Sequence, residues 1–199
     1  MNKFLPIAVL LAGVAVAASG CSTAGPGSPA STPAASQASP SAAATGWESG
    51  PTKDSAARIK AAGLEVLSAE GAAEHFHAHL DVFVDGRPVA VPADIGFSFA
   101  PNGQPNGISA LHTHDGSGVI HIEAAVAGAT YTLGQLLTEW GVQDGTVQGS
   151  AAGWSVAVNG TRQDMPVRSV ILKAHDEVVL YRGAAPSPLP AAFKFPAGE

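Results

Sequence analysis

Six of the seven histidines of this 199-residue chain fall into two short segments, HFHAHLDVFVDG (75–86) and LHTHDGSGVIHIE (111–123). Neutral imidazole offers a nitrogen lone pair near neutral pH, so histidine is the commonest metal ligand. Histidines at alternate positions of a β-strand share one face, with Cα atoms about 6.6 Å apart, and their rings can converge on one ion. The sequence therefore predicts a site for a divalent transition metal, zinc or copper, with these candidate ligands: His75, His77, His79, His112, His114, His121 and Glu123.

The second segment supplies the more complete ligand set. Two histidines at alternate positions, His112 and His114, and a third on the paired strand, His121, give a facial set suited to Zn²⁺, Cu²⁺ or Ni²⁺. Glu123 is either a fourth ligand or a partner that fixes the tautomer of a histidine ring. If the first segment lies alongside, its histidines add ligands or build a second site.

A purely structural reading of these histidines stays open. A hydrogen-bonded row with Asp81, Asp115 and Glu123 would also place histidines on a half-exposed strand face. The crowding of six histidines into two alternating segments favours metal binding over this reading. His175, in a turn beside Asp176, is predicted to be solvated.

The composition excludes several other classes of protein. The only cysteine is Cys21 and the only methionine after the leader is Met165, which excludes iron–sulfur, blue-copper and methionine-rich copper sites. The formal net charge is -6 and aromatic residues make up 6%. Nucleic-acid binding, which needs clustered basic residues, is therefore not expected.

Two hairpins are predicted to carry the histidines. In the first, Asp85-Gly86 is a type I′ turn signal, which pairs Val82 with Val89 and Leu80 with Val91. Even-numbered residues then face the core, and the three histidines share the opposite face with Asp81. Residues 92–107 are rich in glycine, proline and asparagine, and are predicted to form a loop.

The second hairpin closes through a turn at residues 115–118. This turn pairs His112 with His121 and His114 with Val119, and leaves an apolar face on the other side. The apolar face consists of Leu111, Ile120 and Ile122.

Two helices and two further strands are also predicted. Thr132 and Gln135 match a capping box before a helix that ends at Gly141, and residues 52–62 fit a shorter helix capped by Asp54. Trp154–Val158 alternates as a strand that ends at an Asn-Gly turn, and residues 178–181 form a last apolar strand.

This order of elements predicts an α+β fold, a β-grasp-like domain with an additional N-terminal β-hairpin. Residues 131–141, 154–160 and 176–181 resemble the second half of ubiquitin-like sulfur-carrier domains. The sequence ends without a Gly-Gly pair, so the resemblance implies the fold and not the carrier function.

The two histidine segments, together with YTLGQLLTEWGV (131–142), resemble a family of exported bacterial and archaeal proteins. The resemblance covers most of residues 64–183. It implies a shared fold and shared histidines, and it implies no particular activity.

The N-terminal part is predicted to deliver and tether the domain. Residues 1–21 have a short positive start, an apolar run and small residues before Cys21, and resemble a lipoprotein signal peptide in which that cysteine is lipidated. An ordinary secretory signal is the alternative. Residues 22–50, rich in serine, proline and alanine, are predicted to be a disordered tether. Residues 51–185 form the predicted globular domain, and residues 186–199 form a proline-rich tail.

Together these features favour a non-catalytic lipoprotein on the extracytoplasmic face of the cell membrane, which binds copper or zinc. Its expected partners are the membrane, through the lipid anchor, the metal ion and an envelope protein. One alternative is a metal-dependent hydrolase or hydratase, with Glu123 or Asp115 as the base for a metal-bound water. Another is a protein-interaction module of the cell envelope that binds no metal.

Overall fold

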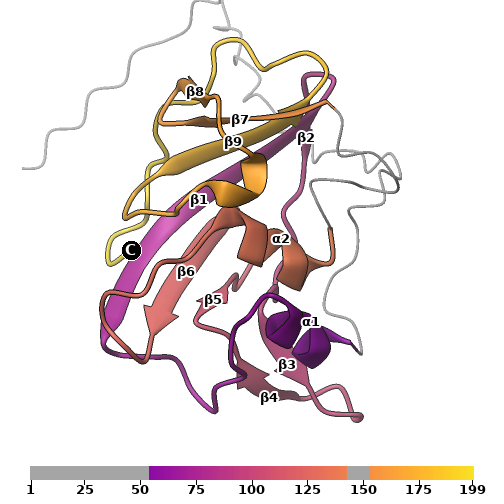
Figure 1. Ribbon diagram of the computed structural model, residues 1–199, viewed down its shortest axis with the longest axis vertical. Coiled ribbons are helices and arrows are strands. Elements are labelled where there is room, and N and C mark those ends of the chain that lie inside the picture. Colours follow the sequence, from indigo (N-terminus) through magenta and orange to yellow (C-terminus); the bar gives the residue numbers. More distant parts are fainter. Residues whose placement is uncertain (1–53, 143–152) are drawn as a thin grey trace, which may run out of the picture. The chain divides into compact units, whose positions relative to one another are not determined.

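The computed structural model describes residues 54–142 and 153–199, which form a mixed α+β fold dominated by sheet (Figure 1). The predicted α+β class is confirmed. The elements are, in chain order, α1 (Ser55–Ala61), β1 (Glu74–Val84), β2 (Arg87–Val89), β3 (Phe97–Phe99), β4 (Pro105–Ile108), β5 (Leu111–His112), β6 (Val119–Ala124), α2 (Leu133–Trp140), β7 (Trp154–Val158), β8 (Thr161–Gln163), the 3₁₀-helix η2 (Val167–Ser169) and β9 (Glu177–Arg182).

The main sheet has seven strands and is organised around the long strand β1. The strand order is β5-β6-β1-β9-β7-β8, and β2 also pairs with β1. The first half of β1 pairs antiparallel with β6, and its second half pairs parallel with β9. The two strands β3 and β4 form a separate small sheet. Because β1 pairs with both β6 and β9, it lies between the strand that carries His121 and the last strand of the sheet in sequence.

One face of the main sheet carries the hydrophobic core. Alternate residues of β1 and β6, such as Leu80 and Ile120, are almost completely buried there. Helix α2 adds Leu136 and Trp140 to the same cluster, as its spacing predicts. The histidines of β1 and β6 alternate with these apolar residues and therefore lie on the opposite face.

The opposite face is covered in part by the C-terminal segment. A small cluster of Ala157, Val179 and Tyr181 lies on this face and packs against Leu189. Further along the segment, the ring of Phe193 stacks on His79, with ring centroids 3.8 Å apart. The residues after β9 form no helix or strand, yet they make specific contacts with the histidine-bearing face.

Both predicted helices are present. The capping box of α2 is confirmed, because the Thr132 hydroxyl accepts from the Gln135 backbone and the Gln135 side chain accepts from the Thr132 backbone. Gly141 ends α2 in the left-handed conformation, with φ of 88°. Helix α1 is shorter than expected: it begins at Ser55, and Asp54 holds the N-cap position without a side-chain cap. Residues 52 and 53 lie outside the described residues.

The prediction of a loop over residues 92–107 is wrong. This segment contains β3 and most of β4, which pair antiparallel with an irregularity between Ser98 and Phe99. The strands are only three and four residues long and β4 contains proline and glycine, so the segment has no pattern that differs from that of a loop. Their position beside β5 places Phe97 next to two histidines.

Two of the four predicted strand pairings are confirmed and two are wrong. The Asp85-Gly86 turn has both φ angles positive and pairs Val82 with Val89, but β2 ends there and Leu80 does not pair with Val91. His112 pairs with His121 as expected. The predicted pairing of His114 with Val119 is wrong, because β5 ends at His112 and Val119 pairs with His79 of β1 instead.

No helix within residues 54–142 and 153–199 is long and apolar enough to cross a membrane.

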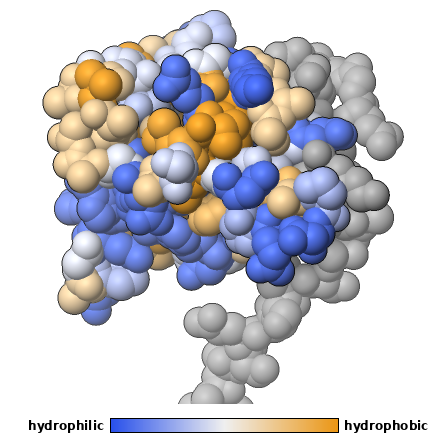
Figure 2. Space-filling model, turned by 90° about the horizontal axis from the view of Figure 1, so that it is seen from below, coloured by the Kyte–Doolittle hydropathy of each residue, from blue (hydrophilic) through white to orange (hydrophobic). Residues whose placement is uncertain are grey.

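The end of the molecule formed by α1, β3 and β4 shows an apolar area surrounded by hydrophilic side chains (Figure 2). Leu64 and Leu67, which follow α1, are half-buried and pack against the core.

Candidate metal centre

Strand pairing brings the two histidine segments together. In the register of β1 and β6, His77 lies opposite His121 and His75 lies opposite Glu123. On the other side of β6, His121 also pairs with His112 of β5. Directly opposed residues have Cβ atoms about 4.5–5.5 Å apart, so these side chains must meet on one face of the sheet. His121 is the central member of a row of three histidines across three strands.

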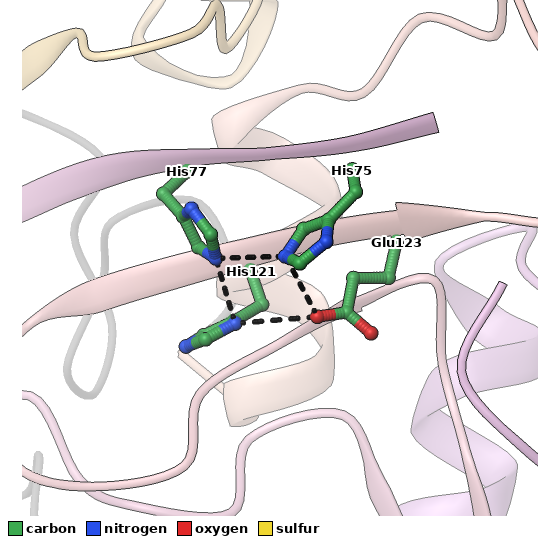
Figure 3. A group of neighbouring side chains, drawn as sticks. All are labelled: His75, His77, His121 and Glu123. Carbon is green, nitrogen blue, oxygen red and sulfur yellow. Dashed lines mark hydrogen bonds and ion pairs between the residues drawn. The ribbon is translucent and has the colours of Figure 1, made fainter. Parts of the chain in front are cut away.

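Four side-chain atoms form a closed ring of short contacts on this face (Figure 3). The Nε2 atom of His77 lies 3.2 Å from His75 Nε2 and 3.0 Å from His121 Nδ1. Glu123 Oε1 lies 3.3 Å from His75 Nε2 and 3.4 Å from His121 Nδ1. A tetrahedral ion with bonds of about 2.0–2.1 Å needs ligand atoms about 3.3 Å apart. These four contacts therefore have the spacing of a tetrahedral ligand set.

Hydrogen bonds alone do not account for this ring. A ring nitrogen carries either one hydrogen or one lone pair in its plane, so it makes one proper hydrogen bond. His77 Nε2 has two nitrogen neighbours at this distance, His75 Nε2 and His121 Nδ1. At most one of the two contacts can therefore be a well-directed hydrogen bond. A cation at the centre removes the conflict, because it accepts a lone pair from every member of the ring.

The surroundings keep the central histidines neutral, which is the form that binds a metal. Burial, followed by the neighbouring His121 and His75, lowers the pKa of His77 to about 4. Burial, followed by His114, lowers the pKa of His121. Burial and the nearby Glu70 raise the pKa of Glu123. At neutral pH the rings therefore do not need to lose a proton before they bind a cation.

A second group adjoins the first. His112, His114 and His121 can each offer a ligand atom within 4.8 Å of the others. His112 is fully buried, and its Nδ1–H donates to the carbonyl of Ser109 at 3.0 Å. This bond leaves the lone pair on Nε2, which lies 3.2 Å from His114 Nε2. Burial lowers the pKa of His112 to about 3, although the bond to Ser109 partly opposes this shift.

The β3 strand supports the second group. The ring of Phe97 makes edge contacts with His112 and His114, with centroids 5.7 and 5.5 Å away. Gly96, with φ of 79°, lies directly against the backbone of β5, and a Cβ atom there would overlap the Leu111 carbonyl oxygen. The close approach that glycine permits therefore holds Phe97 beside these rings.

His79 lies in a separate group with Asp81 and Glu177. Its Nε2–H donates to the carbonyl of Ser117 at 2.9 Å, and its Nδ1 shares a proton with Glu177 at 2.8 Å. Burial alone would lower the pKa of His79, but the hydrogen bond and charge of Glu177 raise it. Both ring nitrogens already have partners, so His79 acts as a buried link between β1 and β9.

The structure separates the seven predicted ligands into a centre and one outlier. His75, His77, His121 and Glu123 come together, His112 and His114 adjoin them, and His79 does not. His175 is exposed, as predicted, with its ring centroid 5.0 Å from that of Phe195.

Sequence reasoning missed several residues around the centre. Glu70 lies 3.5 Å from His114 Nε2 and forms another acidic group with His112 and Glu123. The electrostatic interaction with Glu199 raises the pKa values of His77 and His121 and so partly opposes the effect of burial. Both glutamates lie outside any alternating pattern, so no local signal in the sequence identifies them.

The chain matches no protein-family model, and no significantly similar protein was found among curated proteins or among solved structures.

Proposed function

We propose that this protein binds a divalent transition metal, zinc or copper, through His75, His77, His121 and Glu123. The observation that carries the proposal is the ring of four contacts between 3.0 and 3.4 Å among four potential ligand atoms. Three nitrogens and one carboxylate oxygen suit both metals. Because the rings come from two paired strands, the site is preformed by the sheet.

The ligand set supports holding a metal rather than catalysis by it. Four side-chain ligands fill a tetrahedral site, whereas catalytic zinc keeps one position for water. Two surface clefts lie around β7 and β8, and their linings include residues such as Met165 and Gln163 but none of the histidines. The hydrolase or hydratase alternative needs an open position, and the closed set of four speaks against it.

The site is open to metal arriving from solvent. The His75 side chain is 55% exposed, whereas those of His121 and Glu123 are 12% and 8% exposed. An ion can therefore reach the outermost ligand first and then pass to the buried ones. This arrangement suits a protein that captures metal.

We further propose that the protein is an exported lipoprotein, anchored through Cys21 to the extracytoplasmic face of the membrane. The lipobox-like sequence before Cys21 and the long uncharged tether support this location. The protein would belong to the family of exported proteins that its histidine motifs resemble. The fold would be a β-grasp variant, which the strands β1–β2 and β7–β8, the helix α2 and a β9 parallel to β1 support. In this arrangement the added hairpin is β5–β6, whereas the sequence predicts the N-terminal hairpin as the addition.

The experiment that tests metal binding is elemental mass spectrometry of the full-length protein purified without chelators. We expect near-stoichiometric zinc or copper in the unchanged protein and in His175→Ala. The double variant His75→Ala/Glu123→Gln should lose the ion held by these four ligands, and its fold should survive because His75 is exposed and glutamine has the shape of glutamate. A protein that contains no metal and ignores added Zn²⁺ and Cu²⁺ would make these histidines structural.

A further inference from the structure

We propose that His121 bridges two metal ions, so that the centre is dinuclear. The Nδ1 atom of His121 belongs to the four-ligand site, and its Nε2 atom would serve a second ion bound by His112, His114 and Glu70. This inference rests on the proposed function, because it takes the first ion as given.

The position of His121 is the first argument. It pairs with His77 on β1 and with His112 on β5, so it is the only one of the three that has a histidine on both sides. Its Nδ1 makes the contacts to His77 and Glu123. Its second ring nitrogen points away from that group (Figure 3). The ring centroid of His114 lies 4.5 Å and that of His112 lies 5.3 Å from that of His121.

The state of His112 is the second argument. Its Nδ1–H is committed to the Ser109 carbonyl, and a metal-binding histidine usually donates its other ring N–H in this way. The Nε2 lone pair is then directed toward His114 Nε2 at 3.2 Å. His112 is fully buried. If His114 Nε2 also carries a lone pair, the two lone pairs face each other, which is unfavourable unless a cation or a shared hydrogen lies between them.

The supply of negative charge is the third argument. Glu70 Oε1 lies 3.5 Å from His114 Nε2, and Glu70, His112 and Glu123 can each offer a ligand atom within 4.8 Å of the others. Two carboxylates therefore lie beside each other at the centre, which is costly without cations. When the second ion binds, both nitrogens of His121 coordinate, its remaining N–H proton passes to solvent, and the resulting imidazolate adds one negative charge between the two ions.

The test is the stoichiometry of zinc in the full-length protein, first stripped with a chelator and then equilibrated with Zn²⁺. We expect two tightly bound equivalents in the unchanged protein. His114→Ala should retain one and His75→Ala should retain one, with the other site weakened by about 100-fold or more. The two variants form a matched pair, because their side chains are 43% and 55% exposed and their removal leaves the core intact.

Loading with Cu²⁺ tests the bridge itself. Two copper ions that share an imidazolate couple magnetically, so the electron paramagnetic resonance signal of the doubly loaded protein should fall well below that of two isolated ions. His114→Ala with one ion should give the full signal of one.

The outcomes separate the two proposals. If the unchanged protein binds only one zinc equivalent, and His114→Ala leaves it in place or each variant removes it, the dinuclear centre is overturned and a single site remains. Two uncoupled copper ions overturn the bridge. The absence of any binding to the unchanged protein defeats the proposed function, and the dinuclear centre with it.

Discussion

The Nε2 atom of His77 lies 3.0 Å from the Nδ1 atom of His121, although 44 positions separate the two residues in the sequence. The contact is fixed by the antiparallel register of β1 and β6, in which the two residues are direct partners. Burial is the main cause that lowers the pKa of each ring, so two neutral imidazoles face one another at neutral pH. The sheet thus holds two ligand atoms at the spacing that a bound ion requires.

Zinc is expected to stabilise the folded protein. A ligand that binds only the folded state, at a free concentration of about 100 times Kd, adds about 2.7 kcal/mol to the free energy of unfolding. For a domain of this size the melting temperature should rise by several degrees. Thermal unfolding followed by circular dichroism, with and without Zn²⁺, measures this shift.

The control for zinc stabilisation is a pair of histidine variants. His77→Ala removes a ligand of the four-ligand site and should reduce the shift, whereas His175→Ala should keep it in full because that exposed ring lies outside the centre. An equal shift in both variants would mean that zinc stabilises the protein from elsewhere.

His112 of β5 and His114, which follows this strand, should contribute differently to the stability of the fold. His112 is fully buried and bonded to Ser109, so His112→Ala should lower the free energy of unfolding of the metal-free protein by about 2 kcal/mol or more. His114 is largely exposed, and His114→Ala should change it by less than about 0.5 kcal/mol. Urea unfolding in the presence of a chelator gives both values. Equal losses would show that the exposed ring contributes to the fold as much as the buried one.

The sequence predicts the part of the centre that depends on local patterning. Alternation places His75 and His77 on the face opposite the core, and the turn at residues 115–118 places His112 opposite His121. Both results follow from side-chain period and turn chemistry, which act over a few residues.

The rest of the centre depends on packing between distant segments. The pairing of β1 with β6 determines that His77 meets His121, and nothing within either hairpin specifies which hairpin edges join. Phe97 and Glu70 reach the centre from a short irregular strand and from an exposed segment, neither of which carries a periodic signal. His79 is separate from the other histidines because its ring bonds to Glu177, which lies 98 positions away in the sequence.

The carboxylate of Glu199 should contribute to metal affinity through its charge. It interacts with His77 and His121, and its Oε2 atom is buried without a hydrogen-bond partner among the described residues. Glu199→Gln should weaken Zn²⁺ binding by about five-fold, which corresponds to about 1 kcal/mol for one partly screened charge. Calorimetric titration of the full-length protein measures the change. Asp164→Asn, an exposed change after β8 at the far edge of the sheet, should have no effect.

Glu139 should make the stability of the protein depend on pH. This residue of α2 is 4% exposed, and neither carboxyl oxygen has a well-formed hydrogen bond among the described residues. Burial raises its pKa from 4.5 to about 8, and the Ser109 hydroxyl only partly opposes the shift. Below pH 4.5 both the folded and the unfolded states hold the proton. Between pH 4.5 and about 8 only the folded state holds it, so stability falls as the pH rises, by about 1.4 kcal/mol per pH unit.

Glu139→Gln isolates this effect, because the amide has a similar shape and does not titrate. The variant should have a stability close to that of the unchanged protein at pH 5 and a clearly higher stability at pH 8, when both are unfolded with urea in the presence of a chelator. Other titrating groups, including His79 with its raised pKa, act equally in both proteins and cancel in the difference. A difference that does not change between pH 5 and pH 8 would mean that Glu139 has the same charge in the folded and unfolded states.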